Sequence, residues 1–239
     1  RALSSRGLKI QPFKVGPDYI DPGYHAVACG RLSRNLDVWL TSEEAVVGIF
    51  EKAMRASDIA VVEGVMGLFD GSFEDGCGST AHVAELIDAP IVLVVDARAM
   101  AQSAGALLRG FRDHRPDIRI EGVIFNRVGG ERHEIILARE AERLGLDVVG
   151  FIPNIELDFE ERHLGLVPVE ERESRAEAAI DRMAKLAEGL DLDGLLDIAG
   201  YRPSRESPSP ATEIGVRRNR SARPVRIGVA RDAAFNFYY

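Results

Sequence analysis

Charged and amide side chains lie at the ends of the apolar runs of this 239-residue sequence or within a few residues after them. In chain order, the residues in these positions are Lys14, Asp18, Asp21, Glu63, Asp70, Asp96, Asn126 and Arg127. Carboxylates suit Mg²⁺, which takes one or two of them together with phosphate oxygens and water. A lysine beside them suits a phosphoryl group. These residue types therefore indicate a nucleotide-dependent enzyme that transfers a phosphoryl group or forms an acyl phosphate.

Five short apolar runs must bring these side chains together, and they are Leu8–Val15, Ile59–Val62, Ile91–Val95, Val123–Phe125 and Val148–Ile152. Runs that are apolar throughout are typical of strands buried on both faces of a parallel sheet. Helical patterns lie between them, with a capping box at Thr41–Glu44 and a helix over Glu131–Leu144. The alternation predicts a doubly wound α/β fold with a mainly parallel sheet, whose carboxyl edge binds the ligands.

The first seven residues, RALSSRG, have the pattern of the last turns of a helix that Gly7 ends. The phosphate-loop motif GxxxxGK[ST], which would stand between a first strand and that helix, does not occur in the sequence. We therefore expect a chain that lacks the first strand and the phosphate loop of its fold.

Composition and charge limit the class of protein. Hydrophobic residues make up 46% and charged residues 28%, which indicates a folded core, and the net charge of −8 argues against nucleic-acid binding. No apolar stretch is long enough for a membrane span and no signal peptide is recognisable, so we expect a cytoplasmic protein. Residues 201–226 hold seven arginines against two glutamates. We predict a domain at 1–199, a basic Pro/Ser/Arg-rich linker at 200–224 and the start of a second domain at 225–239.

Six motifs in a fixed order carry a family resemblance. They are KVGPDYIDPGYH (14–25), NLDVWL (35–40), VVEGVMGLFDG (61–71), GSTAHVAEL (78–86), FNRVGGERH (125–133) and ARDAAFNFYY (230–239), and they resemble the cobyrinic acid a,c-diamide synthases. The resemblance implies a P-loop NTPase domain similar to dethiobiotin synthetase, followed by a truncated class I glutamine amidotransferase domain. It also implies ATP and glutamine as cosubstrates and Mg²⁺ as a cofactor in cobalamin biosynthesis. The a and c acetate carboxylates of cobyrinic or hydrogenobyrinic acid would be amidated through an acyl phosphate.

The resemblance assigns roles to the matched positions. The residues that it implies for phosphoryl transfer and for orienting the acetate group and ammonia are Lys14, Asp18, Asp21 and Asp70. The residues that it implies for ligand binding are Tyr19 and Ile20 for the macrocycle, Asp37 and Glu63 for Mg²⁺, and Asn126 and Arg127 for the nucleotide. Plainer interpretations exist, because aspartate is a common turn residue and a lysine at a strand end often forms a structural salt bridge.

Other interpretations stay open at the level of sequence. A nickel-sirohydrochlorin a,c-diamide synthase shares these motifs, and a partitioning-type P-loop ATPase would act as a regulatory binding module instead. Without a phosphate loop, we expect the 239 residues alone to be inactive. The family resemblance also allows a homodimer. The five histidines show no metal-ligand spacing and are interpreted as surface or structurally satisfied residues, and Cys77 as a small loop residue.

Overall fold

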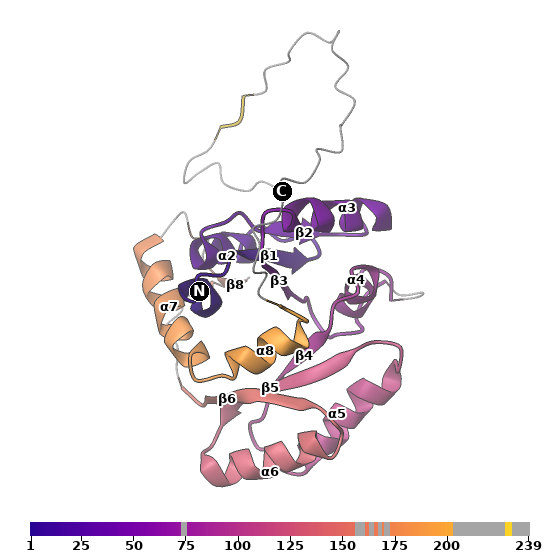
Figure 1. Cartoon of the computed structure of the whole chain (residues 1–239), viewed down its shortest axis with the longest axis vertical. Coiled ribbons are helices and arrows are strands. Elements are labelled where there is room, and N and C mark those ends of the chain that lie inside the picture. The colour runs from indigo at the N-terminus through magenta and orange to yellow at the C-terminus, as the bar shows by residue number, and fades with distance from the viewer. Residues whose placement is uncertain are drawn as a thin grey trace.

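A computed structural model describes residues 1–72, 76–155, 161–162, 165–166, 169, 173–202 and 228–230. Strands and helices alternate along most of this part of the chain (Figure 1). The elements before residue 90 are α1 (Ala2–Ser5), β1 (Ile10–Val15), α2 (Asp21–Cys29), β2 (Arg34–Leu36), α3 (Glu43–Met54), β3 (Ile59–Glu63) and α4 (Thr80–Leu86). Those after it are β4 (Ile91–Asp96), α5 (Ser103–His114), β5 (Ile120–Val128), α6 (Glu131–Glu142), β6 (Asp147–Pro153), β7 (Glu161–Arg162), β8 (Gly165–Leu166), α7 (Glu173–Ala187) and α8 (Leu192–Ile198).

The longer strands form two three-stranded parallel sheets, in the orders β2-β1-β3 and β4-β5-β6. Among the described strands, β3 pairs only with β1 and β4 pairs only with β5. Figure 1 shows the two sheets as an upper and a lower half, with α8 between them. All five predicted apolar runs form strands, and the predicted α/β class with parallel strands is confirmed. The predicted burial on both faces is wrong for β3 and β4, where Val61 is 45% and Val94 is 65% exposed.

Helices cover both faces of the β1 sheet, as a doubly wound fold requires. On one face Phe13 packs with Val46 of α3, and on the other Ile10 packs with Leu192 of α8. Residues 10 and 13 point to opposite faces because side chains alternate along a strand. In the second sheet, Phe125 of β5 is fully buried in one core with residues of α5 and α6. These cores hold the strands rigidly, so the loops at their carboxyl ends have fixed starting points.

Three local expectations from the sequence are corrected. The short polar strand β2 was not predicted, because three residues that include Arg34 and Asn35 show no apolar pattern. Asp21, for which a turn was the plainer interpretation, is the first residue of α2, and the proline that follows it occupies the first turn of that helix. The predicted capping box is displaced by one residue. Ser42 accepts the capping hydrogen bond from the Ala45 N–H, while Thr41 Oγ1 donates to the Asp37 carbonyl.

Most of the C-terminal part of the predicted domain division, the linker and the second domain, lies outside the described residues. The described part of the first domain extends through α7 and α8, which pack with α1 and β1 in one core cluster. Residues 203–227, most of the predicted linker, and 231–239 lie outside the described residues.

Candidate active site

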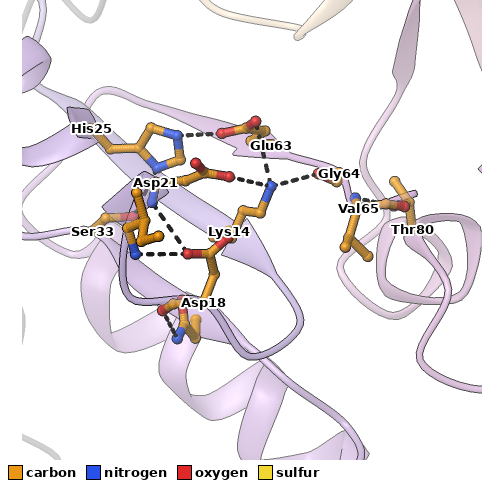
Figure 2. Close-up of polar contacts among 11 residues, drawn as sticks. Lys14, Asp18, Asp21, His25, Ser33, Glu63, Gly64, Val65 and Thr80 are labelled. Atoms are coloured by element: carbon orange, nitrogen blue, oxygen red, sulfur yellow. Dashed lines mark hydrogen bonds and ion pairs between the residues drawn. The ribbon is translucent and has the colours of Figure 1, made fainter. Parts of the chain in front are cut away.

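Lys14 is the buried centre of a polar cluster at the carboxyl end of β1. Its side chain is only 6% exposed, and Nζ lies 2.8 Å from Asp21 Oδ2 and 3.4 Å from Glu63 Oε1 (Figure 2). Nζ also donates to the carbonyl oxygen of Gly64 at 3.0 Å. Burial alone would lower the pKa of Lys14, but the two carboxylates outweigh it and raise that pKa above its ordinary value. The ammonium therefore stays charged with an acceptor for each of its three hydrogens.

The loop after β1 is folded around Asp18. Its Oδ1 accepts backbone N–H groups from Ile20 at 2.8 Å and from Asp21 at 3.2 Å, which forms a turn and directs the start of α2 toward Lys14. Asn35 Nδ2 donates to the Asp18 carbonyl at 2.6 Å and ties the loop to β2. Burial raises the pKa of Asp18, and the nearby Asp21 carboxylate adds to the increase. Tyr19, between the two aspartates, is 43% exposed.

Glu63 ends β3 directly beside Lys14 in the strand register. Its second carboxylate oxygen, Oε2, lies 2.5 Å from Nε2 of His25, and Nδ1 of His25 lies 3.2 Å from the Ser33 hydroxyl (Figure 2). Asp21 and His25 are four residues apart on α2, so one face of this helix contacts both Lys14 and Glu63. His25 was interpreted from sequence as a surface or satisfied histidine. It is satisfied, but its position in the cluster was missed.

Asp37 follows β2 at the same edge and is 5% exposed. Its Oδ1 accepts the N–H groups of Trp39 and Leu40 at 2.9 and 3.1 Å. Its Oδ2 is buried and has no hydrogen-bond partner within the described chain. An unpartnered buried carboxylate oxygen is costly, and a hard divalent cation would satisfy it. Asp37 therefore fits the predicted role of a Mg²⁺ ligand. The two carboxylate oxygens of Glu63 face Lys14 and His25, so its predicted share in that ion stays a prediction.

Asp70 acts within its own loop. Its Oδ2 accepts the Gly67 N–H at 3.1 Å, and its own N–H donates to the Gly67 carbonyl at 3.0 Å. A Cβ atom at Gly67 would lie 2.4 Å from this oxygen, so a larger residue there would displace the Asp70 carboxylate. The same loop is tied to α4 by Thr80, whose Oγ1 accepts the Val65 N–H at 2.9 Å. The substrate-side role of Asp70 stays a prediction.

Asn126 and Arg127 lie in the other sheet, near the carboxyl end of β5. Arg127 has a φ of +60°, which is unusual for a residue with a side chain, and its Nη1 lies 2.8 Å from Asp96 Oδ2. Arg98 chiefly, and then Arg127, lower the pKa of Asp96 to about 2. Asp96 ends β4, and through this contact it anchors Arg127. The nucleotide-binding role of Asn126 and Arg127 stays a prediction.

The β1 sheet thus brings together Lys14, Asp18, Asp21, Glu63 and, along the same edge, Asp37. Within the described ranges there is no group of three or more His, Cys, Asp or Glu residues that forms a metal site. A surface cavity of about 460 Å³ lies elsewhere, beside α4, with Cys77 and His82 in its wall. Its wall includes none of the predicted site residues, and His82 is already bonded to Gly78 N–H and to Glu43. The predicted site residues therefore gather at the strand edge and not at this cavity.

Comparisons with known proteins agree with the motifs. Curated relatives include the hydrogenobyrinate a,c-diamide synthase of Streptomyces coelicolor, which is 50% identical over 83% of this chain and 41% of the relative. The enzyme of the same name from Mycobacterium tuberculosis is 43% identical over the whole chain and 53% of the relative. The cobyrinate a,c-diamide synthase of Methanothermobacter thermautotrophicus is 45% identical over the whole chain and 53% of the relative. The resemblance drawn from the six motifs is confirmed, and the chain spans about half the length of these relatives.

A family comparison covers most of the described chain. Residues 1–167 match the model described as CbiA, the CobQ/CobB/MinD/ParA nucleotide binding domain. None of the helices in the described ranges is long and apolar enough to cross a membrane. The buried lysine, the acidic strand edge and this match agree in assigning the class: the chain belongs to the CobQ/CobB/MinD/ParA nucleotide-binding domain family.

Proposed function

We propose that this chain supplies the ATP-dependent part of an amidotransferase that converts the a and c acetate carboxylates of cobyrinic or hydrogenobyrinic acid to amides. The observation that carries the proposal is the buried Lys14 ammonium, held 2.8 Å from Asp21 and 3.4 Å from Glu63 at the end of β1. A buried, fixed positive charge is suited to a phosphoryl group on which negative charge develops. Relatives named hydrogenobyrinate and cobyrinate a,c-diamide synthase support the choice of substrate.

The proposed reaction has two steps, phosphorylation of the acetate carboxylate and displacement of phosphate by ammonia. An acetate oxygen attacks the γ-phosphorus of ATP, the bond from that phosphorus to the bridging oxygen breaks, and ADP leaves. Ammonia derived from glutamine then attacks the acyl carbon, phosphate leaves with the C–O bond electrons, and the nitrogen loses a proton to give the primary amide.

The chain's own residues orient these steps. Lys14 faces the transferred phosphoryl group, and Asp18 with Asp21 orients the acetate group and ammonia. Asp37 and Glu63 would hold Mg²⁺, whose charge offsets that of the phosphate oxygens when it is bound. We include in the proposal a homodimer, a cytoplasmic location, glutamine bound by a second domain, and Asn126 and Arg127 as nucleotide contacts.

The test compares the protein expressed from its complete gene with the 239-residue chain. Each is incubated with ATP, Mg²⁺, glutamine and either hydrogenobyrinic acid, cobyrinic acid or nickel-sirohydrochlorin, and amides are counted by mass spectrometry. We expect two amidations of a corrinoid by the complete protein and none by the 239 residues. Amidation of nickel-sirohydrochlorin alone would move the assignment to that substrate. ATP hydrolysis without any amidation would favour the regulatory ATPase.

A matched pair of variants tests the metal site. Glu63→Gln should lower turnover by at least about 100-fold, since the charge stabilisation that a bound metal supplies is worth several kcal/mol. Glu121→Gln is the control, because Glu121 is a similarly exposed glutamate at the start of β5, paired with Arg119. Near-normal turnover in Glu63→Gln would remove Glu63 from the metal site.

A further inference from the structure

Large apolar side chains are exposed around the polar cluster, on the loops that follow β1, β2 and β3. These side chains, which we call the apolar rim, are Tyr19 (43% exposed), Trp39 (78%), Leu40 (60%) and Met66 (79%). The three strands are parallel neighbours, so their following loops share the edge that holds Lys14. From β2 to β3 this edge spans about 10 Å, two strand spacings. Exposed apolar side chains gathered around a polar centre mark a surface that contacts something else.

The loop that carries Trp39 and Leu40 is fixed by hydrogen bonds among its own residues. Asp37 accepts hydrogen bonds from the backbone N–H groups of both residues, and the hydroxyl of Thr41 donates to the Asp37 carbonyl at 2.5 Å. The turn therefore directs two large apolar side chains into water while its backbone is fixed. Because the backbone is fixed in advance, binding through these side chains costs less ordering entropy.

Met66 is held outward in the same way. Val65 before it is bonded through both backbone groups to Thr80 Oγ1, and Gly67 after it donates to Asp70 Oδ2. Met66 also has a φ of +49°, in the left-handed region that residues with a side chain rarely adopt. Met66 thus occupies an unfavourable backbone conformation and exposes an apolar side chain. Folding gains from neither property, which points to a role in binding.

The charge at this edge explains why apolar contacts are needed. Four carboxylates stand against the single lysine of the cluster, and they are Asp18, Asp21, Asp37 and Glu63. Coulomb attraction alone cannot hold a substrate that itself carries many carboxylates beside such a centre. Burial of apolar area can supply the missing affinity, because it does not depend on charge.

We propose that the apolar rim binds one face of the tetrapyrrole macrocycle and so directs an acetate side chain at its edge toward Lys14. The inference rests on the proposed function, because a corrinoid is flat and apolar across its ring and carries its carboxylates around the edge. A second copy of this chain fits less well, because an apolar protein face would also cover the half-exposed Glu63 carboxylate. The rim thus contributes the contact area, and the polar cluster selects the carboxylate that reacts.

The test measures binding directly, without turnover. The dissociation constant of hydrogenobyrinic acid is determined by equilibrium dialysis, and quenching of indole emission gives a second readout because Trp39 is the single tryptophan of the sequence. Trp39→Ala and Met66→Ala should each weaken binding about tenfold, the usual size of a central contact residue's effect. Leu32→Ala is the matched control, since Leu32 is 61% exposed but precedes β2 at the opposite edge. Its binding should stay within about twofold of the parent chain.

Met66→Gly separates binding from folding. Glycine adopts positive φ freely, so this variant should melt no lower than Met66→Ala while it still loses affinity. If the parent chain binds the macrocycle and both rim variants bind as tightly, the rim is excluded and the proposed function stands. If the parent chain does not bind the macrocycle, both proposals fail. If sedimentation velocity shows a dimer that Trp39→Ala disrupts while macrocycle affinity is unchanged, the rim is an interface between copies and the inference is overturned.

Discussion

Asp21→Asn should destabilise the fold more than Lys14→Met does, although Lys14 is the charge that is buried. The reason lies in how the charges are solvated. The Lys14 side chain is 6% exposed and depends on protein acceptors, whereas those of Asp21 and Glu63 are 27% and 49% exposed and can be solvated by water. Removing one partner leaves a buried ammonium short of an acceptor, while removing the ammonium leaves two carboxylates that water still reaches.

The magnitudes follow from the three acceptors of Lys14 Nζ. A hydrogen bond to a charged group contributes roughly 1.5–3 kcal/mol, and Asn keeps the shape and one acceptor atom, so Asp21→Asn should cost about 1.5 kcal/mol. Methionine fills the space of the lysine stem without a charge, and replacing a buried charge by an apolar side chain is often neutral. We therefore expect Lys14→Met to change the free energy of unfolding by less than about 1 kcal/mol.

The assay is equilibrium unfolding in urea at pH 7, followed by far-UV circular dichroism, for both single variants and the double variant. The raised pKa of Lys14 means that its contribution to stability is complete below the ordinary value of 10.5 and is lost only as the pH rises through the higher folded-state value. In the Lys14→Met background the cost of Asp21→Asn should vanish, which gives a coupling of about 1.5 kcal/mol. A Lys14→Met variant that is less stable than Asp21→Asn, or a coupling near zero, would show that Lys14 does not depend on Asp21 for solvation. Lys14→Met should nevertheless abolish amidation in the complete protein.

Two further outcomes are expected. Burial raises the pKa of Asp18, so the charged carboxylate destabilises the folded state at pH 7. Asp18→Asn keeps the oxygen that accepts the hydrogen bonds of the turn and removes this charge. The substitution should therefore raise the free energy of unfolding at pH 7. The gain in stability should shrink as the pH falls through the raised pKa toward 3.8. Urea unfolding at pH 7 and at pH 3.5 measures this change. An Asp18→Asn variant that is less stable than the parent chain at pH 7 would contradict the prediction. His25→Leu should raise the Mg²⁺ concentration needed for half-maximal turnover by about 10-fold or more, because Glu63 loses the partner of its Oε2. His25→Gln, which keeps a donor, should restore part of the loss, and equal effects of Leu and Gln would argue against a positioning role.

Much of the fold was accessible from the sequence because its signals are local. A continuous apolar run such as Ile59–Val62 predicts a parallel strand from its own residues, and Glu63 at its end follows from the same pattern. The burial that such a run predicts is confirmed for β1 but is wrong for β3, where Val61 is 45% exposed. The short strand β2 was missed because its residues have no such pattern, and it forms only because β1 beside it offers unpaired backbone groups. The start of α2 at Asp21 was missed because a proline is as typical of a turn as of the first turn of a helix.

The residues of the candidate site were likewise predictable from the sequence, whereas their contacts were not. The identities of Lys14, Asp21 and Glu63 were predictable, because parallel strands bring their carboxyl ends to one edge. The contact between His25 and Glu63 was not, since it depends on the angle at which α2 packs beside β3. The unpartnered oxygen of Asp37 likewise depends on which backbone groups approach it.

Residue types and their periodicity were enough to predict the class of fold, the order of the motifs and the residue types available at the strand edge. The packed chain is needed to show which of these side chains are buried, which are paired, and which are exposed. The outward position of Trp39 and Met66 illustrates the difference, because apolar residues in a sequence predict burial and only the packed chain shows them in solvent. The physical reason is that residue type and periodicity are properties of neighbouring residues, whereas burial and pairing depend on elements far apart in the chain.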